Sequence, residues 1–202
     1  PLFGPALGAH SLVYLRYQED FADSISTPEL LTTTGSTLVV GTGRGDVSAV
    51  MAPTDNLGNT GWVQLGTSHT YTNWPTSGTA VHALTNLTGG PGHVITTSNN
   101  PGDEITMMVV EVLNSSAVVD HQWVERLNTG GAVTSAPVSV TNAALLIAFW
   151  WGDAGVDEDK VATPNNDFEV IDSIGLSGSL VQGFVAVKQV HQTGSYDVSW
   201  DA

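Results

Sequence analysis

The sequence predicts an all-β protein, a single β-sandwich of jelly-roll-like or lectin-like type with about ten or more strands. Short runs rich in Val, Thr, Leu and Ala recur along the chain, and each ends at Gly, Pro, Asn or Ser; Thr37 to Val40, for example, stops at Gly41. No stretch keeps apolar residues at i, i+3, i+4 and i+7, as an amphipathic helix would. The chain has 202 residues, 41% of them apolar, and 22 Gly. This length is enough to bury roughly 70% of the unfolded surface around one core, so residues 1–202 are expected to form one domain.

The expected elements follow the turn residues in order. Residues 1–9, PLFGPALGA, carry two Pro and two Gly and are expected to form an extended N-terminal arm. Pro28 to Leu31 reads as one helical turn, because Thr27 can cap it and Pro suits the first helical position. Strands are expected at 11–17, 37–43, 62–66, 79–85, 92–98, 104–113, 118–126, 132–140, 144–152, 167–173, 180–190 and 195–200.

Side-chain alternation indicates where these strands lie in the sheets. Residues 105–113 and 145–151 are apolar on both faces, which is typical of central strands covered on both sides. Residues 132–140 contain Pro137, which is tolerated at a sheet edge. The predicted core is formed by Leu38, Val40, Val109, Ile147, Phe149 and Val185.

The charge of the chain argues against two classes of partner. Twenty acidic residues face five basic ones, a net charge of −15, which repels phosphate backbones and anionic lipid. We therefore expect neither nucleic-acid binding nor docking on a membrane. The chain has no Cys, hence no disulfide and no thiolate metal site. Its longest apolar run, Ala143 to Trp151, is far shorter than the ~20 residues of a membrane helix.

Several segments, in a recurring order, resemble a known family. They are GSTLVVG (35–41), DNLGNTGWVQLG (55–66), HALTNLTGGPGHVITT (82–97), EITMMVVEV (104–112) and ALLIAFWWG (144–152). This series is similar to a Thr/Gly-rich β-sandwich module of phage virion proteins and large secreted bacterial proteins, and the match covers residues 35 to 200. The resemblance implies a sandwich used for assembly or adhesion, with no family-wide catalytic residues and with His82, His93 and Glu111 in structural roles.

An acidic loop is the candidate cation site. Asp153, Asp157, Glu158 and Asp159 crowd GDAGVDEDK, and Ca²⁺ prefers several carboxylate oxygens in a flexible loop. The spacing is not that of an EF-hand, and Lys160 lies among the acids. A solvated acidic loop is the favoured interpretation, so no metal or other cofactor is expected.

No catalytic constellation passes a spacing test. The six His are scattered, without the HExxH pair that binds zinc. Glu111 is the one acid in a strand that otherwise reads as buried. A glycosidase needs a second carboxylate at a defined distance, and the pattern of sandwich glycosidases is absent. Glu111 is expected to be a hydrogen-bonded structural residue, and no residue is predicted to be catalytic.

Aromatic side chains provide the candidate glycan site. Six Trp are present, and most are expected in the core. Trp74 lies beside Pro75 in a loop that also contains Tyr71, so these two residues are the candidates for stacking on a sugar.

Three functions remain open at this stage. The first is a non-enzymatic structural component of a phage virion, either a capsid decoration or a tail-associated protein. It would assemble with itself, a trimer being the first expectation, and with other virion proteins, with residues 1–9 crossing to an adjacent subunit. The second is an extracellular carbohydrate-binding module that binds surface glycans through exposed Trp. The third is a polysaccharide-active enzyme with an unrecognised carboxylate pair.

Overall fold

A computed structural model describes residues 12–20, 24–45, 51–71, 75–98, 103–115, 117–125, 131–153, 160–175 and 181–201. Within these ranges every regular element is a strand, so the prediction of an all-β chain is confirmed. No helix among the described residues is long and apolar enough to cross a membrane. The strands form several antiparallel sheets.

The first half of the chain builds two sheets. The larger has the order β1-β9-β3-β7-β5, with β6 also paired to β7. Its members are β1 (Leu12–Asp20), β3 (Thr37–Arg44), β5 (Val63–Gln64), β6 (His69–Thr70), β7 (Gly78–Leu84) and β9 (Ile105–Val112). The smaller has the order β2-β8-β4, formed by β2 (Ser24–Ser26), β4 (Thr54–Asp55) and β8 (Ile95–Ser98).

The second half builds the other sheets. One has the order β12-β15-β14, from β12 (Ala144–Asp153), β14 (Glu169–Ile174) and β15 (Val181–Val190). The others are β10-β17-β13 and β11-β16, from β10 (Val133–Thr134), β11 (Val138–Val140), β13 (Thr163–Pro164), β16 (Gly194–Tyr196) and β17 (Ser199–Asp201). Among the described residues, every ladder pairs two strands of the same half.

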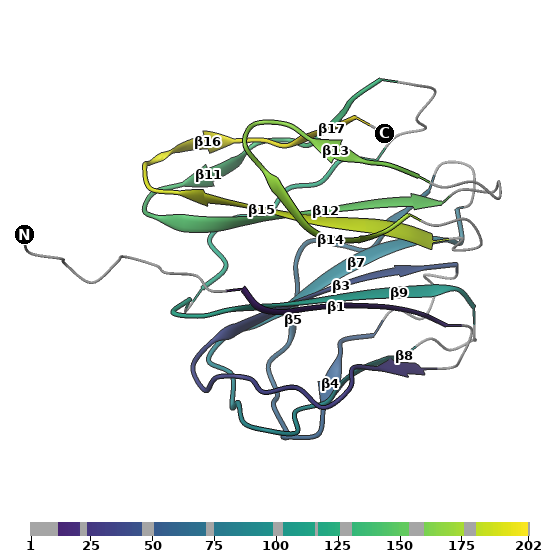
Figure 1. The fold of residues 1–202 in the computed structure, drawn as a ribbon, viewed down its shortest axis with the longest axis vertical. Coiled ribbons are helices and arrows are strands. Elements are labelled where there is room, and N and C mark those ends of the chain that lie inside the picture. The colour runs from purple at the N-terminus through teal and green to yellow at the C-terminus, as the bar shows by residue number, and fades with distance from the viewer. Residues whose placement is uncertain are drawn as a thin grey trace, which may run out of the picture.

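The sheets are stacked in layers (Figure 1), with the β1–β9–β3–β7 sheet and the β12–β15–β14 sheet in the middle. Met108, Val110 and Val185 are buried between these two, with Phe149 and Trp151 packed on them. The opposite face of the larger sheet buries Leu38, Val40, Met107 and Val109 against Leu30, Leu87 and Ile95. The opposite face of the β12–β15–β14 sheet buries Phe184 and Ala186 against Val198 and Trp200.

The core prediction is largely confirmed. Leu38, Val40, Val109 and Val185 are buried, whereas Ile147 and Phe149 are only partly buried. Residues 105–113 were predicted to form a central strand, and β9 does lie between β1 and β3 with all its side chains buried.

Several element predictions are wrong. Residues 145–151 were expected in a central strand, but β12 pairs only with β15 among the described strands and is an edge. The strand expected at 118–126 is not formed by residues 118–125, which are mostly exposed, and Arg126 lies outside the described residues. Pro28 to Leu31 is not a helical turn, because Leu30 bridges to His93. Residues 132–140 lie at an edge as expected, but Pro137 divides them into β10 and β11. The expected 62–66 strand shortens to 63–64.

Candidate binding site at the edge of β12

A cavity of about 1020 Å³ lies along β12 and is lined by residues of the two central sheets, of the β10–β17–β13 and β11–β16 sheets, and of the 117–125 segment. The larger sheet contributes Val39 from β3 and Val81 from β7 to its wall. The opposite wall is the face of β12 that carries Leu145, Ile147, Phe149 and Trp151. Those apolar side chains face the cavity because successive residues of a strand point to opposite sides of the sheet.

Gly41 of β3 sets how closely the two sheets approach at this wall. A Cβ placed on Gly41 would lie 2.9 Å from Cζ2 of Trp151 and 3.2 Å from Cδ1 of Phe149. The rings of Phe149 and Trp151 are themselves stacked, with centroids 5.4 Å apart. Trp151 Nε1 is buried and has no hydrogen-bond partner within the described part of the chain. This part of the cavity wall therefore places a buried indole N–H between apolar groups.

The outer side of the cavity is formed by an exposed aromatic pair. The indole of Trp123 stacks on the imidazole of His69, with ring centroids 3.5 Å apart and an interplanar angle of 24°. Trp123 remains 52% exposed. Burial lowers the pKa of His69, His121 adds to that shift, and Glu125 opposes it. At neutral pH His69 is therefore an uncharged partner for the indole.

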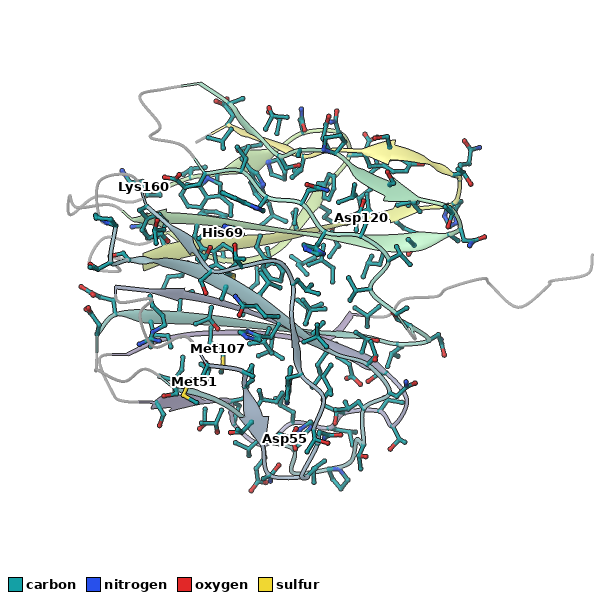
Figure 2. All side chains as sticks on the ribbon, turned by 180° about the vertical axis from the view of Figure 1, so that it is seen from behind. Met51, Asp55, His69, Met107, Asp120 and Lys160 are labelled. Atoms are coloured by element: carbon teal, nitrogen blue, oxygen red, sulfur yellow. The ribbon has the colours of Figure 1, made fainter. Side chains whose placement is uncertain are left out.

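Asp120 fixes the segment that carries Trp123. Its Oδ2 accepts a hydrogen bond from the Ser139 amide at 2.7 Å, and its Oδ1 accepts one from the His121 amide at 2.8 Å. These backbone hydrogen bonds lower the pKa of Asp120, because they stabilise the charged carboxylate. In Figure 2, His69 and Asp120 lie on the same side of the molecule, at the level where the two central sheets meet.

The predicted site residues are distributed unevenly. Tyr71 lines the cavity, whereas Trp74 lies outside the described residues. Asp157, Glu158 and Asp159 also lie outside them, as does the side chain of Asp153, and the part of the chain that is described contains no group of three potential metal ligands. Residues 1–9 are likewise outside the described ranges.

Trp123 is the site residue that sequence reasoning missed. Its neighbourhood, AVVDHQWVE, was interpreted as a strand, which would have placed the indole in a sheet. The adjacent polar residues Asp120, His121 and Gln122 were the available signal for an exposed segment.

The two titratable residues most suited to chemistry lie away from the cavity, in a buried network. Glu111 Oε1 accepts hydrogen bonds from the Thr33 amide and from the Ser36 hydroxyl, both at 2.7 Å. His93 Nδ1 is hydrogen-bonded to Thr32 Oγ1 at 2.8 Å, and its Nε2 lies 3.7 Å from Asp55 Oδ1. Glu111 and His93 are 1% and 0% exposed, so a substrate cannot reach them. They hold the 30–36 segment against the larger sheet.

Two asparagine side chains, Asn56 and Asn59, hydrogen-bond the loop after β4 to neighbouring loops. Asn56 donates to the carbonyl of Gly92 and accepts from the amide of Val94, both at 2.8 Å. Asn59 donates to the carbonyl of Thr88 at 3.0 Å and accepts from its amide at 2.8 Å. Each amide group thus satisfies a donor and an acceptor of a neighbouring loop, as a paired strand would.

Comparison with known proteins adds no family: no protein-family model, curated protein or solved structure matches the chain. The site is a cavity with apolar and aromatic walls at β12 and polar side chains along residues 120–125, a combination suited to binding a group that has both apolar and polar parts.

Proposed function

We propose that the chain is a non-enzymatic structural component of a phage virion, a capsid decoration or tail-associated protein that assembles with itself and with other virion proteins. We propose its layered sheets as one sandwich of jelly-roll-like or lectin-like type, related to the Thr/Gly-rich module of virion and secreted bacterial proteins. A homotrimer is the assembly we propose first.

One observation carries this proposal: polar side chains, the buried Glu111 and the exposed Asn56 among them, join loops that are distant in the sequence. Glu111 hydrogen-bonds to the Thr33 amide and the Ser36 hydroxyl and so joins the 33–36 loop to β9. Asn56 joins the loop after β4 to the hairpin at 92–94. Hydrogen bonds between segments distant in the sequence favour a single rigid arrangement. A domain whose loops are held by such hydrogen bonds keeps its shape, and this property supports a structural role within a particle.

The experiment is to purify phage particles from the source through a density gradient and quantify the chain by mass spectrometry against the major capsid protein. We expect a fixed copy number per particle that persists after a high-salt wash. Presence in the lysate with absence from the washed particle would overturn the proposal.

A carbohydrate-binding module, extracellular or on a particle, is the second candidate, and the exposed Trp123 beside the Tyr71-lined cavity favours it. Aromatic rings of this kind can stack on a sugar face. Glycan arrays with the native chain and Trp123→Ala test this function. Binding that the substitution abolishes would support it, with Trp200→Phe, at a buried site, as the matched control. A polysaccharide-active enzyme is the third candidate, tested by turnover on polysaccharide panels.

A further inference from the structure

We infer that the open edge of β12 is a docking site for residues 1–9 of a second copy of this chain, which add to the sheet as an extra strand. Phe3 and Leu7 of the added segment would enter the cavity beside β12. The inference rests on the proposed structural role and names the contact through which copies of the chain assemble.

Among the described strands, none pairs with the edge of β12 that faces away from β15. Its ten residues pair with β15 on one side, and no strand or backbone hydrogen bond of the described residues is found on the other. The sequence ALLIAFWWGD carries no charge before Asp153. Long uncharged edges present unpaired N–H and C=O groups and invite pairing with another chain.

The other long edges differ from β12 in this respect. The edge strand β14 carries Glu169 and Asp172 and has a register shift between Val170 and Asp172. The edge strand β1 carries Arg16, Glu19 and Asp20 and has a register shift between Leu12 and Leu15. Charges and bulges are the devices by which natural sheets prevent edge pairing. Of these three edge strands, β12 has neither a register shift nor a charged residue before Asp153, so its edge is the best suited of the three to pair with an added strand.

The cavity gives the added strand a place for its side chains. The cavity of about 1020 Å³ beside Ile147, Phe149 and Val81 is large enough to receive side chains of an added strand. The apolar side chains that line it from β12 and from Val39 and Val81 favour apolar side chains on the added strand.

Residues 1–9 have a length and an apolar composition that suit pairing with β12 and entry into the cavity. PLFGPALGA carries no charged side chain, and nine residues in extended form span about 30 Å, close to the length of β12. In an extended strand, odd-numbered residues direct their backbone N–H and C=O groups to one side and even-numbered residues to the other. Pro1 and Pro5, which lack an N–H, can therefore both lie on the side that faces away from β12. Leu2, Gly4, Ala6 and Gly8 would then direct their N–H and C=O groups to β12. Phe3 and Leu7 would share the face that enters the cavity.

The position of β1 favours a second copy over the same molecule. β14 contacts β1, and β15 contacts β9 and β3. β12 therefore lies on the flank away from β1, the strand that residues 1–9 precede. Two copies, each with a net charge of −15, repel one another, and an uncharged contact adds no further repulsion.

Cysteine cross-linking in the full chain tests the site directly, because the native sequence has no Cys. Two differently tagged single variants, Leu7→Cys and Ile147→Cys, are mixed, oxidised and analysed by mass; Leu145→Cys and Phe149→Cys cover neighbouring registers. We expect mixed covalent dimers with at least one β12 position and none with Val170→Cys on the β14 edge. Absence of all β12 cross-links, or cross-links formed only within a molecule carrying both cysteines, would overturn the inference.

Matched proline variants test the strand geometry. Ala6→Pro removes an N–H that faces β12, whereas Ala9→Pro removes one that points outward. We expect Ala6→Pro to weaken self-association at least tenfold in sedimentation equilibrium and Ala9→Pro to leave it within about twofold. Equal effects of both substitutions, or a native chain that stays monomeric at high concentration, would contradict the inference. The particle-association experiment is independent, so a virion component that assembles through another surface would be recognised as such.

Discussion

Gly41 lies directly beneath Trp151, and a methyl group on Gly41 would come within 2.9 Å of the indole Cζ2. The contact joins the two halves of the chain through side-chain packing, because Gly41 belongs to β3 and Trp151 to β12. The small residue allows the sheets to approach, and the indole fills the space above it.

Replacement of Gly41 by Ala should therefore destabilise the protein. The added methyl overpacks a site where Trp151 and Phe149 are both in contact, and overpacking typically costs about 1–3 kcal/mol of the free energy of unfolding. Urea denaturation measures the change. Gly90→Ala is the matched control, since the nearest atom to its Cβ is 4.0 Å away, and it should change stability by less than about 0.5 kcal/mol. Equal losses in the two variants would contradict the packing argument.

Substitutions at Glu111 should act on stability. Glu111→Leu leaves the Thr33 amide without its acceptor, while the Ser36 hydroxyl keeps the Thr33 carbonyl, so we expect a loss of about 1–3 kcal/mol in all. Glu111→Gln keeps one acceptor oxygen and should cost less. A double-mutant cycle with Ser36→Ala, measured by urea denaturation, should give a coupling energy of about 1 kcal/mol or more. A coupling energy near zero would rule out the bond as a stabilising contact. If Glu111→Gln instead abolished a measured turnover with folding intact, the non-enzymatic proposal would fail.

Stability should fall as the pH drops below about 6.5, the ordinary pKa of His. Burial lowers the pKa of His82 and of His93, and in His93 Asp55 and Glu111 only partly oppose that effect. The unfolded chain then binds protons before the folded chain does, at a cost of about 1.4 kcal/mol per histidine per pH unit. The stabilisation is complete above that pH and is lost as the pH falls toward the folded-state pKa. Chemical denaturation between pH 7.5 and pH 5.5 measures the slope.

His93→Gln should flatten that pH dependence, whatever it does to stability at pH 7.5. His191→Gln, at an exposed position, serves as the control and should retain the native slope. An unchanged slope in His93→Gln would show that another group is responsible.

Removal of the indole at Trp123 should raise the pKa of His69 toward its ordinary value. Burial is the main cause of the lowered pKa, and the stacked indole, 3.5 Å from the imidazole, covers one face of that ring. NMR titration of the imidazole protons measures the shift, with Trp123→Phe expected to retain more of it. If the titration curve of His69 is the same in Trp123→Ala, the indole does not exclude water from this ring.

The sequence predicts the strands best where each has an unambiguous environment. β9 is apolar on both faces and is buried on both. β12 has the same pattern, but it is an edge strand, because one face packs on the β3 region and the other on Trp200 and Val198 without a second neighbouring strand. Apolar alternation reports coverage of the two faces and carries no information about hydrogen bonding at the sides.

The candidate site was less accessible to sequence reasoning because it depends on contacts between distant residues. His69 and Trp123 stack although they are 54 residues apart in the sequence, and the residues around each of them give no indication of this contact. The buried role of Glu111 was predictable, since a single acid within an apolar strand requires donors. Its donors, Thr33 and Ser36, could be named only after the loop was placed.

The separation of the ladders into two halves has a consequence for how the chain can be divided. A cut between Glu125 and Gly131 would interrupt none of the described ladders, and the pieces would retain the side-chain contact built from Gly41, Met108, Phe149 and Trp151. The protein is thus suited to fragment complementation, in which two separately expressed polypeptides recover one fold through their shared hydrophobic surface.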